Sequence, residues 1–165
     1  MPPPVAAAAA FGISYRPETD ADLAFVAALY ASTRAQEVAA TGWPEAMQAA
    51  FLEQQHRAQH GHYRAAYPDA EWLIVEQGGA PIGRLYLVEQ DDMLLLVDIS
   101  LLPDARGGGL GTAILTDLLA AETRPVQLHV ELTNPAQRLY ARLGFERVEV
   151  QAIRARMVRQ PEAPV

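Results

Sequence analysis

Hydrophobic side chains recur at helical spacing in the first third of the chain. A short strand is expected over Ile13–Arg16, and a helix follows it. The apolar positions of that helix repeat at i, i+3, i+4 and i+7, which predicts one buried face: Leu23, Val26, Ala27 and Tyr30. Thr19 and Asp22 have the spacing of a capping box, in which a hydroxyl and a carboxylate satisfy free N–H groups at a helix start.

The segment Thr41-Gly42-Trp43-Pro44 combines residues that end helices. A second helical stretch is expected from Glu45 towards Tyr67, with Gly61 as a point of interruption. The first two helices are therefore predicted to be separate and joined by a short connection.

Three apolar runs with the character of strands come next. Trp72–Glu76 and Ile82–Val88 flank Gln77-Gly78-Gly79-Ala80-Pro81, a sequence typical of a hairpin turn. Met93–Leu101 is apolar on both faces except at Asp98 and Ser100, which predicts a central strand covered on both sides.

The second half of the chain alternates strands with helices. A glycine turn leads into a helix, and a strand over Val126–Leu132 follows, so Met93–Leu101 and this strand are predicted to be parallel with a right-handed crossover. Asn134-Pro135 opens a last helix, Gly144 ends it, and Val148–Val158 supplies one or two closing strands.

Length and composition fit one soluble globular domain. The chain has 165 residues, of which 50% are hydrophobic and 20% are charged. We expect a disordered tail over residues 1–12, one domain over 13–159 and a short tail over 160–165. The start lacks the basic region of a signal peptide and is too short to span a bilayer, so a cytoplasmic location without membrane contact is expected.

Charge and cysteine content exclude several classes of function. The 13 cationic residues are all arginine, and 20 acidic residues outnumber them, giving a net charge of -7. A nucleic-acid partner is not expected, because such proteins carry a basic field. The chain has no cysteine, which excludes disulfides, thiolate zinc sites and a cysteine nucleophile.

The glycine turn is the most specific feature of the sequence. Its residues lie between a strand and a helix, where backbone N–H groups can face outward and the helix adds its positive dipole end. We expect this turn to hold a pyrophosphate, with a guanidinium adding a charge-assisted contact. The residues concerned are Arg106, Gly107, Gly108, Gly109, Leu110, Gly111 and Thr112.

Two other phosphate-binding motifs do not match the sequence of the glycine turn. The P-loop requires a lysine, and the chain has none. The dinucleotide fingerprint requires glycine or alanine three residues past its second glycine, whereas Thr112 and Ile114 stand there in the two registers.

Arg106, Gly109 and Gly111 match the signature of the GCN5-related N-acetyltransferase (GNAT) family, which this chain resembles. A second element of the family follows at its usual distance, the segment Asn134–Phe145. The order of elements from Ile13 to Arg159 also resembles that fold. The resemblance implies an α/β fold with a mixed, mostly antiparallel sheet of six to seven strands, a central parallel pair and about four flanking helices.

By this resemblance the chain would bind acetyl-CoA as acyl donor, without a metal. Backbone groups of Ile99, Ser100 and Leu101 would pair with the pantetheine arm, and one such N–H would stabilise the oxyanion. Residues Arg106 to Thr112 would hold the pyrophosphate. Asn134 would contact the cofactor or cap the last helix, and both roles stay open.

The resemblance also suggests catalytic residues. Tyr140 stands where the family has its proton donor, although a buried tyrosine can also be a core residue. Asp98 interrupts the apolar central strand and is the first candidate for the general base; a structural carboxylate bonded to backbone or arginine is equally consistent. Glu131 and His129 on the neighbouring strand are alternatives.

No sequence motif identifies the amine that accepts the acetyl group. In the family that this chain resembles, the first two helices and their connection determine which acceptor binds, and here they correspond to Ala31 to Tyr67. Glu37, Trp43 and Tyr63 are therefore candidates for lining the acceptor site. The pair His56 and His60 lacks a carboxylate at metal-binding spacing, and a solvated helix face is favoured for it. A catalytically silent acyl-CoA-binding module is the rival function, and the closing strands leave an edge that a homodimer could use.

Overall fold

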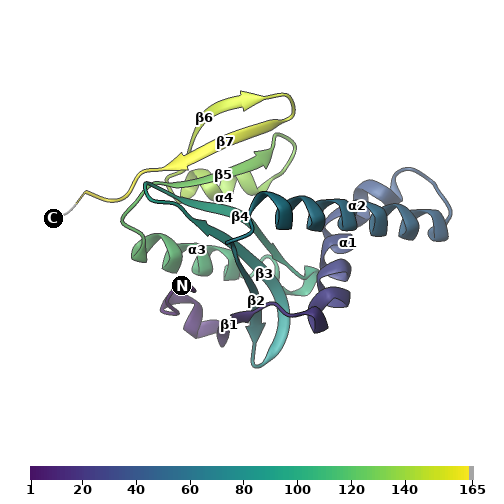
Figure 1. Cartoon of the computed structure of the whole chain (residues 1–165), viewed down its shortest axis with the longest axis horizontal. Coiled ribbons are helices and arrows are strands. Elements are labelled where there is room, and N and C mark those ends of the chain that lie inside the picture. The colour runs from purple at the N-terminus through teal and green to yellow at the C-terminus, as the bar shows by residue number, and fades with distance from the viewer. Residues whose placement is uncertain (164–165) are drawn as a thin grey trace.

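The computed structural model describes residues 1–163, so the last two residues of the C-terminal tail expected over 160–165 lie outside it. Figure 1 shows the chain as one twisted sheet with helices on either side. The helices are α1 (Leu23–Ala39), α2 (Glu45–Ala66), α3 (Leu110–Ala121) and α4 (Ala136–Arg142), with 3-10 turns η1 (Ala7–Phe11), η2 (Asp20–Asp22) and η3 (Pro103–Ala105). The strands are β1 (Ile13–Pro17), β2 (Glu71–Gln77), β3 (Ala80–Glu89), β4 (Leu94–Leu101), β5 (Val126–Glu131), β6 (Glu146–Gln151) and β7 (Arg154–Arg159).

The sheet has 7 strands in the order β1-β2-β3-β4-β5-β7-β6. Neighbouring strands are antiparallel except β4 and β5, which are parallel. The expected hairpin, the parallel pair, its crossover helix α3 and the mostly antiparallel sheet are thereby confirmed. Gly61 does not interrupt α2, because its position in the helix is open and needs no special backbone angle.

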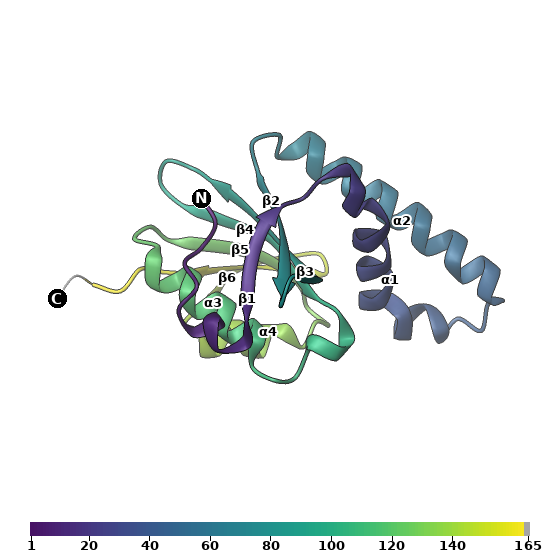
Figure 2. The same cartoon turned by 90° about the horizontal axis from the view of Figure 1, so that it is seen from below.

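The two faces of the sheet carry different cores. One face packs against η1, α3 and α4 and holds the aliphatic core, which includes Leu85 on β3, Leu96 on β4 and Leu128 on β5. The other face lies beneath α1 and α2, where Tyr86 is fully buried and packs edge-on against Trp72. Figure 2 shows α3 and α4 together on one side, with α1 and α2 at the other end of the sheet. In residues 1–163, no helix is both long and apolar enough to cross a membrane.

The entry into α1 is fixed by the expected capping box. Asp22 accepts a hydrogen bond from the Thr19 backbone N–H at 2.8 Å and pairs with Arg16 on β1 at 2.8 Å. The Arg16 contact is the main cause that lowers the pKa of Asp22 to about 2, with burial opposing it. This carboxylate therefore ties the start of the helical pair to the edge of the sheet.

The central strands β4 and β5 separate soon after they meet. Their parallel pairing covers only Leu94–Leu96 of β4, against Val126, Gln127 and Leu128 of β5. Directly after this parallel pairing, the register between β3 and β4 shifts by one residue: Leu87 pairs with Leu96, whereas Tyr86 pairs with Asp98. Val97 is thus the extra residue of a bulge, a device that bends a strand. The remainder of β4 has no strand neighbour on its β5 side.

The N-terminal segment is anchored to α3. The buried carboxylate of Asp117 accepts the backbone N–H groups of Ala6, Ala7 and Ala8 at 3.0, 2.7 and 2.9 Å. This contact differs from the disorder expected over residues 1–12. Its physical reason is a partner 111 residues away from Ala6, which no local pattern in the proline- and alanine-rich start could indicate.

Replacing Asp117 by Asn tests this anchor. Burial opposes ionisation, but the three N–H donors hold the pKa of Asp117 below its ordinary value. The carboxylate therefore stabilises the fold above its unfolded-state pKa, and that stabilisation is lost as the pH falls through the folded-state pKa. At pH 7 the Asp117→Asn variant should lose about 1–3 kcal/mol of unfolding free energy in urea titrations.

Two observations would contradict this account of Asp117. The deficit should shrink as the pH falls below about 4, so a constant deficit would exclude a charge-dependent contact. The exposed Asp69→Asn is the control and should be near neutral, and an equal loss there would remove the special role of Asp117.

Gly83 tests the close approach of β3 to β4. A Cβ at Gly83 would lie 2.4 Å from the Ser100 carbonyl oxygen and 2.7 Å from a Leu101 methyl. Gly83→Ala should therefore push β4 aside and lower the thermal midpoint by several degrees, about 4 °C or more. The control Gly61→Ala meets open space on a helix and should stabilise by about 0.5–1 kcal/mol. A Gly83→Ala variant as stable as the wild type would show that β4 is free to shift.

Candidate functional site

The glycine turn presents a row of unpaired backbone donors. Gly107 and Gly109 adopt left-handed φ values of 79° and 88°, which turn the chain sharply before α3. The first hydrogen bond into α3 runs from Ala113 N–H to Gly109 C=O at 3.0 Å. In the described part of the chain, no N–H from Gly107 to Thr112 donates to a protein acceptor.

The surroundings of this turn are open. A Cβ added at Gly107 or Gly108 would meet no heavy atom within 4 Å. Outward N–H groups in such a turn, at the start of a helix of 12 residues, form a site that attracts a pyrophosphate. The predicted anion site therefore has the required donors and the required space.

The Arg106 guanidinium was expected to contact the pyrophosphate, but in the structure it is bonded elsewhere. Its Nε donates to the Leu101 carbonyl at 2.8 Å, and Nη2 lies 3.3 Å from the Ser32 hydroxyl of α1. The guanidinium thus links the end of β4 to α1. The backbone donors, rather than Arg106, make up the open part of the turn.

Beyond Leu96 the β5 side of β4 is an open strand edge, termed the cleft, which leads towards this turn. Ile99, Ser100 and Leu101 pair with Leu85, Arg84 and Gly83 on one side only. Their other side lies beyond the point where β5 has diverged, which leaves polar backbone groups for an extended, amide-bearing ligand. The Leu101 carbonyl is already taken by Arg106.

Asn134 caps the start of α4. Its Oδ1 accepts the Ala136 N–H at 2.9 Å, the local contact expected of Asn before a helix. The side-chain NH₂ makes no hydrogen bond among residues 1–163 and remains available to a ligand. The capping role is thus visible, and the ligand role stays a prediction.

Tyr140 of α4 stands at the β5 side of the cleft. Its ring is 8% exposed and packs against Phe145 with centroids 5.8 Å apart. The hydroxyl has no hydrogen-bond partner in the described residues, yet it is not among the fully buried unpartnered atoms, so it reaches accessible space. Burial, and then the charge of Asp98, raise the pKa of Tyr140 to about 12, which keeps the hydroxyl protonated at neutral pH.

Asp98 is engaged by other side chains. It forms a short ion pair with the buried Arg84 of β3 and accepts a 2.7 Å hydrogen bond from the Ser100 hydroxyl. Burial opposes the charge of Arg84, but Asp98 holds the pKa of that guanidinium above its ordinary value. The sequence did not single out Arg84, because an arginine in a hairpin strand resembles any exposed cation.

The remaining acceptor-side candidates separate into two groups. His129 and Glu131 lie on the face of β5 opposite the aliphatic core, and Tyr63 lies across from them on α2. A cavity of about 70 Å³ brings Tyr63 and His129 together with other residues of α2, β4 and β7: His62, Tyr67, Leu95, Leu96, Val97 and Arg154.

Glu37 and Trp43 are not part of this cavity. Glu37 pairs with Arg34 at 2.9 Å on α1, and Trp43 packs against Phe51 at the α1–α2 connection. Figure 1 shows that connection projecting away from the sheet. Arg154 does line the cavity, but the sequence did not indicate it. Its position on a closing strand does not show that α2 packs near it.

The helix face with His56 and His60 is not solvated as expected. His56 is 9% exposed, and its ring lies 5.4 Å from that of Tyr30. His60 Nε2 lies 3.8 Å from Glu18, which is buried and also accepts from Arg64 at 2.6 Å. The packing of α2 onto the sheet is the reason. Within residues 1–163 no cluster of three potential metal-binding side chains occurs.

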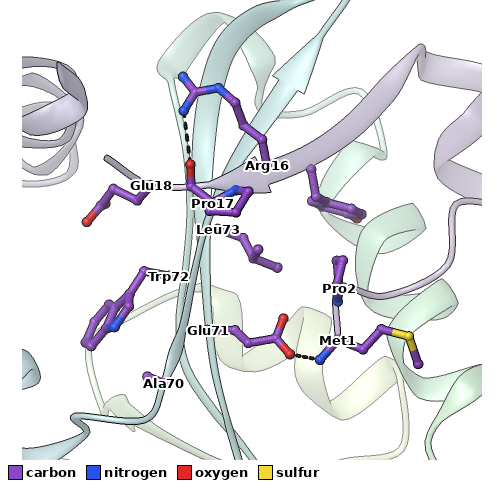
Figure 3. Close-up of a pocket in the computed structure, with 10 residues that line it drawn as sticks. Met1, Pro2, Arg16, Pro17, Glu18, Ala70, Glu71, Trp72 and Leu73 are labelled. Carbon is purple, nitrogen blue, oxygen red and sulfur yellow. Dashed lines mark hydrogen bonds and ion pairs between the residues drawn. The ribbon is translucent and has the colours of Figure 1, made fainter. Parts of the chain in front are cut away.

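A larger cavity of about 380 Å³ lies at the far edge of the sheet, between the N-terminus and the strands β1 and β2 (Figure 3). Met1 and Pro2 line it, with the Met1 ammonium paired to Glu71. Neither the glycine turn nor Tyr140 lies there. Volume alone therefore does not mark the predicted site, whose glycine turn follows the end of β4 and whose Tyr140 lies on the helix after β5.

Comparisons with known proteins agree with this geometry. Residues 68–147 match the family model described as "Acetyltransferase (GNAT) domain". A mycothiol acetyltransferase of Saccharomonospora viridis is 42% identical over 77 residues, which cover 44% of this chain and 22% of that protein. A mycothiol acetyltransferase of Actinosynnema mirum is 52% identical over 50 residues, 27% of this chain and 17% of that protein. The similarity thus spans about a fifth of these curated relatives.

Solved structures share the fold over most of the chain. The PaiA N-acetyltransferase of Thermoplasma acidophilum in complex with coenzyme A has a TM-score of 0.67 at 15% identity, over 90% of this chain and 98% of that one. An acetyltransferase from Thermus thermophilus has a TM-score of 0.64 at 18% identity, over 89% and 96%. The domain match over residues 68–147 and the shared fold confirm the resemblance of this chain to the GCN5-related N-acetyltransferase family that the sequence motifs indicated.

Proposed function

We propose that this protein is an acetyl-CoA-dependent N-acetyltransferase in which a primary amine of a small molecule or protein attacks the acetyl group directly. The observation that carries the proposal is the row of free N–H groups from Gly107 to Thr112, joined to an unpaired strand edge and a protonated tyrosine. The coenzyme A named for the T. acidophilum protein supports the choice of donor.

The residues present fit acetyl-CoA. The free donors of the glycine turn would hold the pyrophosphate, and the open side of β4 would pair with the amide-bearing arm as an added strand does. An arm lying along β4 would direct its thiol end towards the point where β4 and β5 separate, near Val97. When bound, acetyl-CoA supplies an acetyl group activated as a thioester.

The chain's own groups would accelerate the transfer mainly by position and charge. A backbone N–H on the open side of β4 would donate to the carbonyl oxygen as negative charge develops there. Such a donor is fixed by the β3–β4 ladder and needs no reorganisation. Holding amine and carbonyl in contact lowers the entropic part of the barrier.

Tyr140 would donate a proton to the departing thiolate. The hydroxyl carries its proton at neutral pH, and its oxygen is not among the fully buried atoms without a partner in residues 1–163. The acceptor must lose a proton as well. Asp98 remains a candidate for that step, with its Arg84 pair stabilising the carboxylate, and His129 and Glu131 remain the alternatives.

A catalytically silent acyl-CoA-binding module would use the same turn and the same strand edge. Tyr140 favours an enzyme, because it stands where the family has its proton donor, and Asp98 adds an acidic group that could take the proton of the amine. The homodimer and the cytoplasmic location expected from the sequence stay predictions. The edge strand β6 is exposed along its length and is the surface on which a dimer would be tested.

Gly108 offers a clean test of the cofactor site, because its φ is ordinary and a side chain there meets open space. Gly108→Glu should fold normally, place a carboxylate among the pyrophosphate donors and weaken acetyl-CoA binding about a hundredfold or more in isothermal titration. Gly108→Ala is the matched control and should bind within a few-fold of the wild type. Equal affinity in all three proteins would remove the glycine turn from the site.

Tyr140→Phe distinguishes the enzyme from the module. Removing the proton donor should lower kcat about 10²–10⁴-fold while acetyl-CoA affinity stays near that of the wild type, as measured by thiol release against a panel of amines. Tyr15→Phe is the control, since the Tyr15 hydroxyl likewise has no partner in residues 1–163 but is fully buried and lies on β1, away from the glycine turn. Turnover unchanged in Tyr140→Phe would refute the proton-donor role, and no turnover in the wild type with normal binding would favour the module.

A further inference from the structure

The cavity of about 70 Å³ on the α2 side of the cleft has aromatic and aliphatic walls, and the three basic residues that also line it, exposed at its mouth, have no acidic one beside them in the lining. His62, His129 and Arg154 contribute its charged and ionisable groups, from α2, β5 and β7. This composition runs against the chain as a whole, in which 20 acidic residues outnumber 13 arginines. A local basic site in an acidic protein attracts anions selectively.

Arg154 is the strongest anion-binding group in this cavity. Its side chain makes no hydrogen bond, and no ion pair with a carboxylate within 4.0 Å, in the described part of the chain. Its guanidinium can therefore offer a planar fork of donors, which matches the geometry of a carboxylate or phosphate. The hydroxyls of Tyr63 and Tyr67 also lie at this cavity and have no partner among residues 1–163.

The nearby carboxylates do not neutralise Arg154. Asp98 is committed to Arg84, and Glu149 is paired with Arg156 at 3.1 Å. Glu131 is the cross-strand neighbour of Arg154, but no ion pair within 4.0 Å joins them. Burial, then the charges of Arg154 and Arg156, lower the pKa of the His129 imidazole, so Arg154 carries the positive charge of this group at neutral pH.

The position of the cavity separates it from the pyrophosphate site. Leu95, Leu96 and Val97 line it at the beginning of β4, whereas the glycine turn follows the end of that strand. At about 3.3 Å per residue the two lie on the order of 20 Å apart. The cavity also adjoins the point where β4 and β5 separate, which is where the acetyl group would sit.

We infer that the acceptor amine carries a compact oxyanion, a carboxylate or a phosphate, that binds in the cavity formed by Arg154, His62 and His129. The inference rests on the proposed function and narrows its acceptor to small amino acids or amino phosphates. A volume on the order of two water molecules suits one such group and not a long side chain. The amine of the same molecule then points towards the mouth of the cleft.

Paired substrates test this inference. Each of a set of L-amino acids is compared with its carboxamide, and O-phosphoethanolamine is compared with ethanolamine, in thiol release from acetyl-CoA. The oxyanion member of at least one pair should have the higher kcat/KM by about ten- to hundredfold, and Arg154→Gln should abolish that advantage without slowing the neutral member. The pair that responds identifies the oxyanion as carboxylate or phosphate.

The control is Arg142→Gln, which removes an exposed arginine that makes no contact in the described residues and should leave all rates unchanged. Neutral amines used as well as their oxyanion partners would overturn the inference. So would an oxyanion preference that survives in Arg154→Gln.

A binding measurement separates this inference from the proposed function. The chain has 4 histidines, so their imidazole NMR signals can be assigned individually. Amino acids or O-phosphoethanolamine should shift the His62 and His129 signals but not that of the buried His56, with half-saturation raised about tenfold or more in Arg154→Gln. Such shifts without turnover would refute the enzyme and keep the anion site. No shift with any of these probes would overturn the site.

Discussion

The separation of β4 from β5 is the constraint on which the rest of the molecule depends. Two parallel strands inside a sheet normally continue side by side, because each satisfies the polar backbone of the other. Here the pairing stops at Leu96 and Leu128, and the bulge at Val97 bends β4 just beyond that point. The sheet remains continuous through its antiparallel neighbours, so a cleft opens in its middle without loss of the fold.

Each functional group owes its position to this separation. The glycine turn follows the end of β4, Tyr140 lies on the helix after β5, and the basic cavity adjoins the point where the strands part. The strands hold these groups rigidly because β3 supports β4 and β7 supports β5. In the proposed function, a donor along β4 and an acceptor from beneath α2 would approach the cleft from opposite sides.

The local features of this site could be predicted from the sequence, whereas the long-range contacts could not. The Thr19–Asp22 box, the glycine turn and the Asn134 cap involve residues within a few positions, so spacing alone indicates them. The anchoring of residues 6–8 by Asp117, the ion pair of Arg84 with Asp98 and the burial of His56 depend on which surfaces meet in the fold. From the sequence alone, a charged side chain is expected to be solvent-exposed, because its partner on another element is not known.

The Arg84–Asp98 pair shows why this distinction matters for the chemistry. A buried ion pair gives little net stability, because the lost hydration of both charges offsets their attraction. It does fix a negative charge beside the cleft, and that charge contributes to the raised pKa of Tyr140. Burial is the first cause of that rise and Asp98 the second, so the carboxylate held by Arg84 adds to the effect of burial on the Tyr140 phenol. Whether Asp98 also accepts the proton of the amine, or His129 or Glu131 does so, stays a prediction, and Asp98 is the first candidate.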